Sequence, residues 1–174
     1  MIAAYILSAW LAADLATGIV HWWEDRYGNP AWPILGPHVV APNIRHHSEP
    51  RAFLQGGYWT RNWTTVLPTA AIAGAALALG QHWLALAAAF ATQANEIHGW
   101  AHQRCSRPIR GLQLLGMLSS PDGHAAHHSS PFATDFCVMS DWLNPTLSML
   151  GFWRGLEAVV GLAGIHPRPE RQTA

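Results

Sequence analysis

Histidines at helical spacing are the main chemical feature of this 174-residue chain, which contains eleven of them. His98 and His102 are four residues apart, and residues at this spacing share one face of an α-helix. His124 precedes His127 and His128 by three and four residues, with two small alanines between them. Imidazole is a good ligand for zinc, copper, iron and nickel. Each cluster therefore predicts a metal site.

Two more clusters enlarge the set of candidate ligands. His21 stands four residues before Asp25, again on one helix face, and a His-His pair follows in the next loop. Together the four clusters supply eight histidines and one aspartate: His21, Asp25, His46, His47, His98, His102, His124, His127 and His128. One four-coordinate zinc ion needs fewer ligands, so the set suits two metal ions of higher coordination number. The isolated His38, His82 and His166 are expected to be surface or packing residues.

Two further polar residues are predicted to hydrogen-bond to the metal ligands. Asp14 lies seven residues before His21 on the same stripe of a helix, about 10 Å away along its axis. That is too far to bind the same ion, but near enough to hydrogen-bond to a ligand from another helix. Inside an apolar span a carboxylate costs about 2.5–3.5 kcal/mol, so Asp14 should face a polar interior. Asn95, one turn before His98, is a similar candidate.

The elements that carry these residues are apolar and long. Charged residues make up only 11% of the chain and apolar residues 50%, and a bilayer core needs about 20 mostly apolar helical residues. We predict spans at about 2–21, 64–80 and 83–102, with the last two joined as a tight antiparallel hairpin. The interrupted stretch 147–165 suits a half-buried or interfacial helix. The predicted fold is all-α: a single-domain integral membrane helical bundle, 1–174, with three transmembrane helices and this C-terminal helix.

A soluble helical bundle is the alternative, because alanine is only weakly hydrophobic and the mean hydropathy is only +0.08. Tryptophans near the ends of the apolar stretches favour the membrane, since tryptophan is enriched at its interface. Zero net charge argues against a nucleic-acid partner. Two distant cysteines, Cys105 and Cys137, provide no disulfide framework.

Arginine placement predicts the orientation in the membrane. Arginines follow the first span and the third, and the turn at 80–82 has none. The positive-inside rule then places residues 23–63 and 103–174 in the cytoplasm, and all eight clustered histidines on that side. Arg45, Arg51 and Arg61 are topology signals on this interpretation, although a basic rim would also hold a phospholipid headgroup.

The donor set favours iron over zinc. Eight imidazoles with few carboxylates suit two irons that react with O2, and apolar helices could admit a lipid chain. Removing hydrogen from an unactivated CH2 group needs an oxidant that no acid–base side chain supplies. A zinc hydrolase would use three protein ligands, a water and a general base such as Glu24, Glu49 or Glu96. The surplus of histidines argues against it.

Five blocks, in order, resemble the plasmanylethanolamine desaturase family, the Kua or CarF-like lipid desaturase domain, which includes the plant plastid palmitate trans-desaturase. They run from about residue 13 to residue 157. The blocks are ADLATGIVHW with Asp25 and Gly28, HHSEP at 46–50, NEIHGWAH at 95–102, HAAHH at 124–128 with Pro131, and FC at 136–137 followed by WLN at 142–144 and GFWR at 151–154. The chain departs from the family pattern at Gly123, where relatives commonly have another histidine, and at Asp141, where they usually have glycine.

The resemblance implies a membrane-embedded oxidase with two iron ions that desaturates a lipid chain. It would use O2 and two electrons from a carrier such as cytochrome b5 or ferredoxin with its reductase. The nine clustered residues would be the ligand set, with Asp25 either binding metal or hydrogen-bonded to a ligand. The expected substrate is the 1-O-alkyl chain of an ether phospholipid, which becomes the vinyl ether of a plasmalogen. Alternatives are an acyl-lipid desaturase acting near the carboxyl end of an ester-linked chain, and a non-catalytic membrane metal-binding protein.

The amino-acid usage of the chain predicts the membrane in which the protein is located. Ten arginines with no lysine, together with abundant alanine, suggest a GC-rich bacterial source. We therefore expect a multi-pass protein of the bacterial inner membrane, with its active site facing the cytoplasm.

Overall fold

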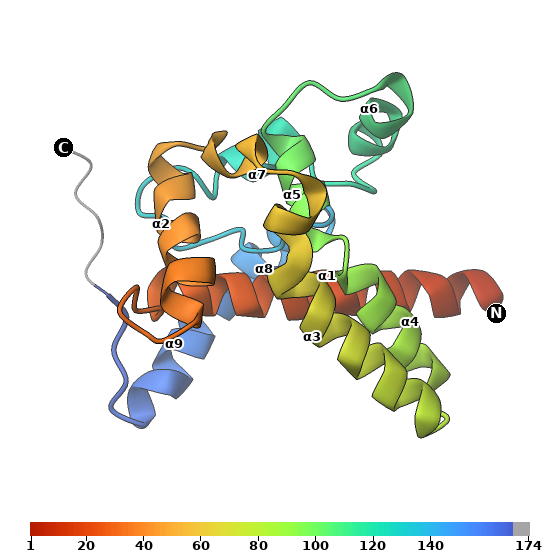
Figure 1. Cartoon of the computed structure of the whole chain (residues 1–174), viewed down its shortest axis with the longest axis horizontal. Coiled ribbons are helices and arrows are strands. Elements are labelled where there is room, and N and C mark those ends of the chain that lie inside the picture. The colour runs from red at the N-terminus through yellow and green to blue at the C-terminus, as the bar shows by residue number, and fades with distance from the viewer. Residues whose placement is uncertain (169–174) are drawn as a thin grey trace.

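Helix α1 (Ile2–Arg26) runs through the whole molecule (Figure 1). It belongs to a computed structural model that describes residues 1–168. Its 25 residues span about 37 Å, and within the described chain it is the one helix long and apolar enough to cross a membrane. Ile2, Ile6 and Leu7 are exposed near its start, whereas Ala9 and Ala13 are buried against other helices.

Helices α3 (Tyr58–Ala78) and α4 (His82–Ala91) form the hairpin expected from the short linker between the second and third predicted spans. The turn at 79–81 includes Gly80 at φ +70°, a conformation that glycine adopts without strain. Small side chains pack between the helices and against α1, including the buried Ala76, Ala85 and Ala88. Such residues allow helix backbones to approach closely.

The prediction of one continuous helix over 83–102 is wrong. Helix α4 ends at Ala91, and α5 (Ala94–Ala101) begins after a two-residue turn. At the turn, the Thr92 hydroxyl donates to the Ala89 carbonyl at 2.7 Å, and the Gln93 N–H donates to the Phe90 carbonyl at 3.0 Å. These local bonds compete with the regular helical pattern. Helix α4 alone is about 15 Å long, roughly half the thickness of a bilayer core.

The predicted C-terminal helix at 147–165 is also divided. The structure has α8 (Leu143–Met149) and α9 (Phe152–Leu162), with Gly151 between them in the left-handed conformation at φ +64°. Helix α9 is tied to the end of α1, because the Arg26 guanidinium donates to the Glu157 carboxylate at 2.6 Å. Glu157, a charged residue within the predicted apolar stretch 147–165, therefore forms an ion pair between α9 and α1.

The remaining elements are short. They are α2 (Ala41–Ser48), α6 (Arg107–Leu114), α7 (Pro121–Ala125), a π-helical turn at Gly36–Val40 and a 3-10 turn at Ala52–Gln55. The chain has no strand between residues 1 and 168, so the all-α prediction is confirmed. In the view of Figure 1, α2, α5 and α7 lie on one side of α1 and α9 on the other.

Two apolar clusters pack around the part of the fold that carries the histidines. The first joins α1 to α4 and α5 through Ala13, Ala91 and Ile97, together with Met139. The second surrounds the C-terminal end of α1 and includes Trp22, Phe136 and Trp153 from three separate segments. The C-terminal part of α1 is thus fixed from several sides.

Candidate metal centre

The last two turns of α1 present His21 and Asp25 on one face. His21 Nε2 lies 3.3 Å from Asp25 Oδ2, and both side chains are almost fully buried. Arg168 caps this end of the helix, because its guanidinium donates to the carbonyls of Glu24 and Asp25 at 3.0 and 2.6 Å. Carbonyls at a helix C-terminus lack partners within the helix, so this cap fixes the turn that carries Asp25.

Helix α2 supplies the adjacent pair His46 and His47. Neighbouring residues on a helix point about 100° apart, and the two rings accordingly turn toward different sets of partners. The helix ends where Glu49 precedes Pro50 and adopts ψ 74°, since a residue before proline disfavours the helical conformation. The proline thus stops α2 directly after its ligands.

Helix α5 carries His98, and His102 occupies its C-cap. The helix is joined to α3 by a polar contact around Glu96, whose Oε1 accepts from the Arg61 guanidinium and from Asn62 Nδ2, both at 2.7 Å. Asn95 Nδ2 adds a bond to the Arg61 carbonyl at 2.9 Å. These bonds fix the rotation of α5 and hence the direction of His98.

The short helix α7 positions the last three histidines. Ser120 caps its start by accepting a hydrogen bond from the Gly123 N–H at 3.0 Å, as serine commonly does at this position. His124 lies inside the helix, and His127 and His128 lie in the turn that follows. The three rings therefore gather around a helix end rather than along a helix, and His127 turns toward a different group of partners from His124 and His128.

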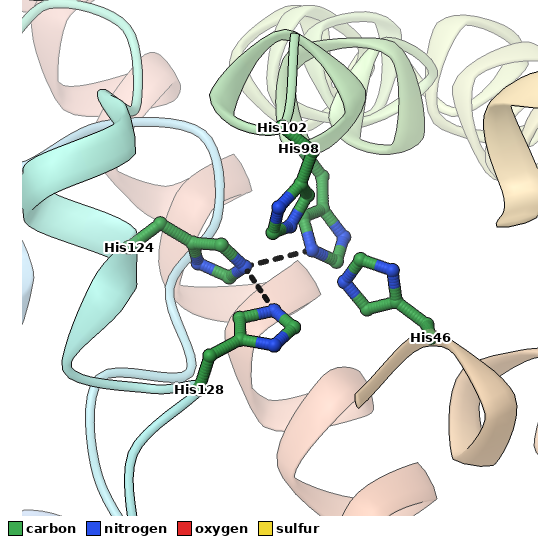
Figure 2. Close-up of side chains that lie close together, drawn as sticks. All are labelled: His46, His98, His102, His124 and His128. Carbon is green, nitrogen blue, oxygen red and sulfur yellow. Dashed lines mark hydrogen bonds between the residues drawn. The ribbon is translucent and has the colours of Figure 1, made fainter. Parts of the chain in front are cut away.

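Five histidines converge on one point from three segments: α2, α5, and α7 with the turn that follows it (Figure 2). Every ligand atom of this five-histidine group lies within 4.8 Å of the others; its members are His46, His98, His102, His124 and His128. His124 Nε2 lies 2.9 Å from His98 Nε2 and 3.0 Å from His128 Nε2. Two nitrogens bound about 2.1 Å from one ion at right angles would be about 3.0 Å apart. The spacing therefore fits neighbouring ligands of one metal ion.

Burial prepares these imidazoles to donate lone pairs. Desolvation lowers the pKa of His46, His124 and His128 below the ordinary histidine value, and the other imidazoles nearby lower it further. Metal ions bind the neutral imidazole, so the rings are in the correct protonation state at neutral pH. The five-histidine group offers only uncharged nitrogen ligands.

The second group consists of His21, Asp25, His47 and His127, and we call it the Asp25 group. His47 Nε2 lies 2.9 Å from Asp25 Oδ1, and His127 Nε2 lies 3.2 Å from Asp25 Oδ2. Asn43 Nδ2 donates to Asp25 Oδ1 at 2.6 Å. The Asp25 group therefore combines three imidazoles with one carboxylate.

The tautomer of His127 points to a cation in the Asp25 group. Its Nδ1 lies 3.0 Å from the Thr134 carbonyl oxygen, which can only accept, so Nδ1 carries the proton. In the neutral ring Nε2 then has only a lone pair, and it has no hydrogen-bond partner although the Asp25 carboxylate is close. Two acceptors face each other here, and a proton or a metal ion between them would relieve the repulsion. A carbonyl on the far nitrogen is a common support for metal-binding histidine.

The two groups touch each other. Ring centroids lie 5.3 Å apart for His21 and His98, 5.0 Å for His47 and His128, and 5.2 Å for His124 and His127. All nine clustered residues thus lie in two adjoining groups. His38, His82 and His166 lie outside both groups.

Asp14 and Asn95 have partners other than the predicted ones. Asp14 is fully buried, and its carboxylate accepts hydrogen bonds from the Met139 N–H at 2.9 Å, the Ser140 N–H at 3.1 Å and the Ser140 hydroxyl at 2.6 Å. The prediction that it bonds to a ligand is corrected: it anchors a non-helical backbone segment whose amides need acceptors. Asn95 bonds to the Arg61 carbonyl rather than to a histidine.

Two contributors were not predicted. Asn43 stands four residues before His47, and this spacing could have identified it as a neighbour on the same helix face. The Thr134 contact uses a backbone carbonyl, for which the sequence carries no signal. Both act on residues of the Asp25 group.

Comparisons with known proteins give one family. The lipid desaturase domain matches residues 10–170. Over 181 residues, covering 98% of this chain and 64% of the relative, the chain is 28% identical to a plasmanylethanolamine desaturase of Myxococcus xanthus. It is 30% identical to plasmanylethanolamine desaturase 1 of Mus musculus, covering 95% of this chain and 67% of the relative. It is 29% identical to the chloroplastic fatty acid desaturase 4 of Arabidopsis thaliana, covering 95% of this chain and 52% of the relative.

The chain therefore spans about two thirds of the length of the first two relatives and about half of the third. No solved structure matches it.

Proposed function

The chain belongs to the lipid desaturase domain family, and on this premise we propose that it is a membrane desaturase with two iron ions, which converts the 1-O-alkyl chain of an ether phospholipid to a vinyl ether. The supporting observation is the meeting of nine metal-ligating side chains in two adjoining buried groups. Iron is favoured because imidazole-rich sites suit it and because the reaction is an oxidation.

The stoichiometry requires an oxidant and two electrons. A CH2–CH2 unit, O2, two electrons and two protons give CH=CH and two molecules of water. Iron with O2 would supply the oxidising power that protein side chains lack. We expect the electrons to come from a small carrier such as cytochrome b5 or ferredoxin, kept reduced by its reductase.

The protein's own residues hold and orient the metal centre. The Thr134 carbonyl fixes the tautomer of His127, and Asn43 holds the carboxylate of Asp25. Asp25 supplies the one negative charge among the nine side chains at neutral pH. Apolar neighbours such as Phe136, whose ring centroid lies 5.0 Å from that of His127, keep water from this side of the site.

Membrane attachment is proposed through the exposed apolar surface of α1, α3 and α4. Leu67, Ile72 and Leu77 on α3, and Leu84 on α4, are exposed in addition to the N-terminal half of α1. Patches of this kind mark protein or membrane contacts. The multi-pass arrangement, proposed from the lengths of the apolar stretches, and the cytoplasmic side of the histidines, proposed from the arginine distribution, remain part of this proposal. So does the bacterial inner membrane, which rests on ten arginines with no lysine and abundant alanine.

An ester-linked acyl chain, desaturated near its carboxyl end, is the second candidate substrate. It is favoured by the similarity to the Arabidopsis protein, whose identity is close to that of the two plasmanylethanolamine desaturases. In both substrates the reacting carbons are close to the headgroup, so both suit a site near the membrane surface.

Lipid mass spectrometry tests the proposal and separates the two substrates. The full-length chain is expressed in a host that lacks plasmalogens, supplied with alkyl ether phospholipid. We expect vinyl ether lipids, identified by their acid lability and their loss of two mass units. A new double bond in ester-linked chains with no vinyl ether would support the second substrate. Absence of any desaturated product, with O2, reductant and bound iron all present, would reject the desaturase.

A further inference from the structure

An arginine-lined cavity opens beside His102. Its volume is about 680 Å³, and its lining includes Arg51, Arg104 and Arg110 together with Ala101 and His102. A second cavity of about 510 Å³ shares Arg51 and Arg104 with the first. The three arginines come from three separate segments: the turn after α2, the loop after α5, and α6. The fold thus collects positive charge at one hollow.

These guanidinium groups have no carboxylate partner within the described chain. Glu49 is the acidic residue in the cavity lining, and its carboxylate is already paired with Arg45 at 2.7 Å. Arg61 on α3 is paired with Glu96. The cavity therefore carries about three uncompensated positive charges in a chain whose formal net charge is zero. An anion is the ligand that complements such a cavity.

Guanidinium groups match phosphate in particular. Arginine donates two parallel hydrogen bonds to a phosphate or a carboxylate and keeps its charge at any physiological pH. A hollow of about 680 Å³ suits a small molecule that carries such an anionic group more than the flat contact of a partner protein. The phosphate chemistry could be that of a lipid headgroup or of free phosphate.

The position of the cavity selects the lipid headgroup. His102 lines the cavity and also belongs to the five-histidine group, so one side chain separates the anion site from the candidate metal site. In a glycerophospholipid only a few covalent bonds separate the phosphate from the first carbons of the sn-1 chain. A phosphate in the cavity would bring those carbons toward the histidines.

We propose that Arg51, Arg104 and Arg110 bind the phosphate of the lipid substrate and thereby set which carbons of its chain reach the metal centre. This inference rests on the proposed function for the identity of the lipid. The anion site itself rests on the cavity and its unpaired arginines.

The test is direct binding, measured without turnover on the full-length, iron-loaded protein in detergent. The probe is a short-chain alkyl ether phosphoethanolamine lipid, compared with the same lipid lacking its phosphate. For the variant with Arg51→Gln and Arg104→Gln we expect binding of the phospholipid to weaken at least tenfold, as loss of charge-assisted hydrogen bonds predicts. Binding of the phosphate-free lipid and iron content should not change.

Arg107→Gln is the matched control, because Arg107 lies on α6 beside Arg110 but does not line the cavity. It should bind the phospholipid like the wild type. Arg110→Gln alone provides an independent variant, and its thermal unfolding should match that of the wild type because its exposed side chain has no bonded partner in the described chain.

Three results would overturn the inference. The first is unchanged phospholipid binding in all cavity variants. The second is tight binding of inorganic phosphate that displaces the lipid, which would make free phosphate the ligand. The third is normal lipid binding with slower reduction by the electron carrier, which would assign the cavity to an acidic protein partner.

Failure of the anion site and failure of the proposed function are distinguishable. A wild-type protein that binds the phospholipid through these arginines but forms no desaturated product rejects the desaturase and leaves the site intact. A wild-type protein that desaturates the lipid, with cavity variants that bind it equally well, rejects the site alone.

Discussion

Gly123 lies directly against the carboxylate of Asp141, and a β-carbon at position 123 would overlap it. Asp141 Oδ1 also accepts a hydrogen bond at 3.1 Å from the N–H of Ser120, the residue that caps α7. These are the two positions at which the chain departs from the pattern of the family it resembles. The absent side chain at one position makes room for the carboxylate at the other, and together they seat the helix that carries His124.

The first prediction follows from this contact. Gly123→Ala should lower the free energy of unfolding by about 1–3 kcal/mol, as overpacking does. The variant that combines Gly123→Ala with Asp141→Ala should lose less than the sum of the two single changes, because the clash is gone. Denaturant unfolding of the four proteins in detergent measures this. Strictly additive losses would show that the two residues do not interact.

The second prediction concerns Asp14, which accepts three hydrogen bonds from Met139 and Ser140. Asp14→Asn removes the charge and places a donor where acceptors are needed. We expect a loss of about 2 kcal/mol in stability, since hydrogen bonds to charged groups contribute about 1.5–3 kcal/mol. Activity should fall more than iron content does. Ser140→Ala, which removes one of the three bonds, should cause a smaller loss of stability.

If Asp14→Asn lost as much iron as His124→Ala, Asp14 would act on the metal directly. The anchoring role that its hydrogen bonds indicate would then be wrong.

The third prediction compares histidines of the two groups with one outside them. His124→Ala and His127→Ala should each abolish desaturation and each lower the iron content by about one ion per chain, because each removes a ligand from a different group. His82→Ala should do neither, since His82 is exposed at the start of α4. Iron analysis and product assays on the three purified variants measure this. Equal damage from His82→Ala would contradict the location of the site.

The fourth prediction is the pH dependence of the metal-free protein. Burial lowers the pKa of His46, His124 and His128, so below pH 6.5 the unfolded chain takes up protons that the folded chain does not. Stability should therefore fall as the pH falls from 7 to 5, by at most about 1.4 kcal/mol per pH unit for each histidine. Bound metal should shift this loss to lower pH, because it competes with protons for the rings. A metal-free stability that rises on acidification would contradict the neutral, buried state of these rings.

The candidate ligands could be predicted from spacing because helical periodicity acts over short distances. His98 and His102, or His21 and Asp25, need only one turn of helix to share a face. Division into two groups could not be predicted, since it depends on how four distant segments pack. The adjacent His46 and His47 turn into different groups, and no local pattern distinguishes them.

The fold was predictable as all-α, with a tight hairpin turn expected at 80–82 and found at 79–81, because long apolar stretches and short linkers are explicit in the sequence. The helix breaks were not. Thr92 and Gln93 fit a helical pattern, and the turn there depends on local hydrogen bonds and on the attachment of α5 to Arg61. The sequence identifies Asp14 as an unusual carboxylate within an apolar stretch. Its partners Met139 and Ser140 lie about 125 residues further along the chain, and helical periodicity cannot predict a contact over that separation.

Metal analysis of the purified full-length wild-type chain tests the account most directly. The two adjoining groups predict about two iron ions per chain, with desaturation of the lipid that depends on both O2 and reductant. A single zinc ion with no iron would contradict the account, because one metal cannot occupy both the five-histidine group and the Asp25 group, and zinc supplies no oxidising power.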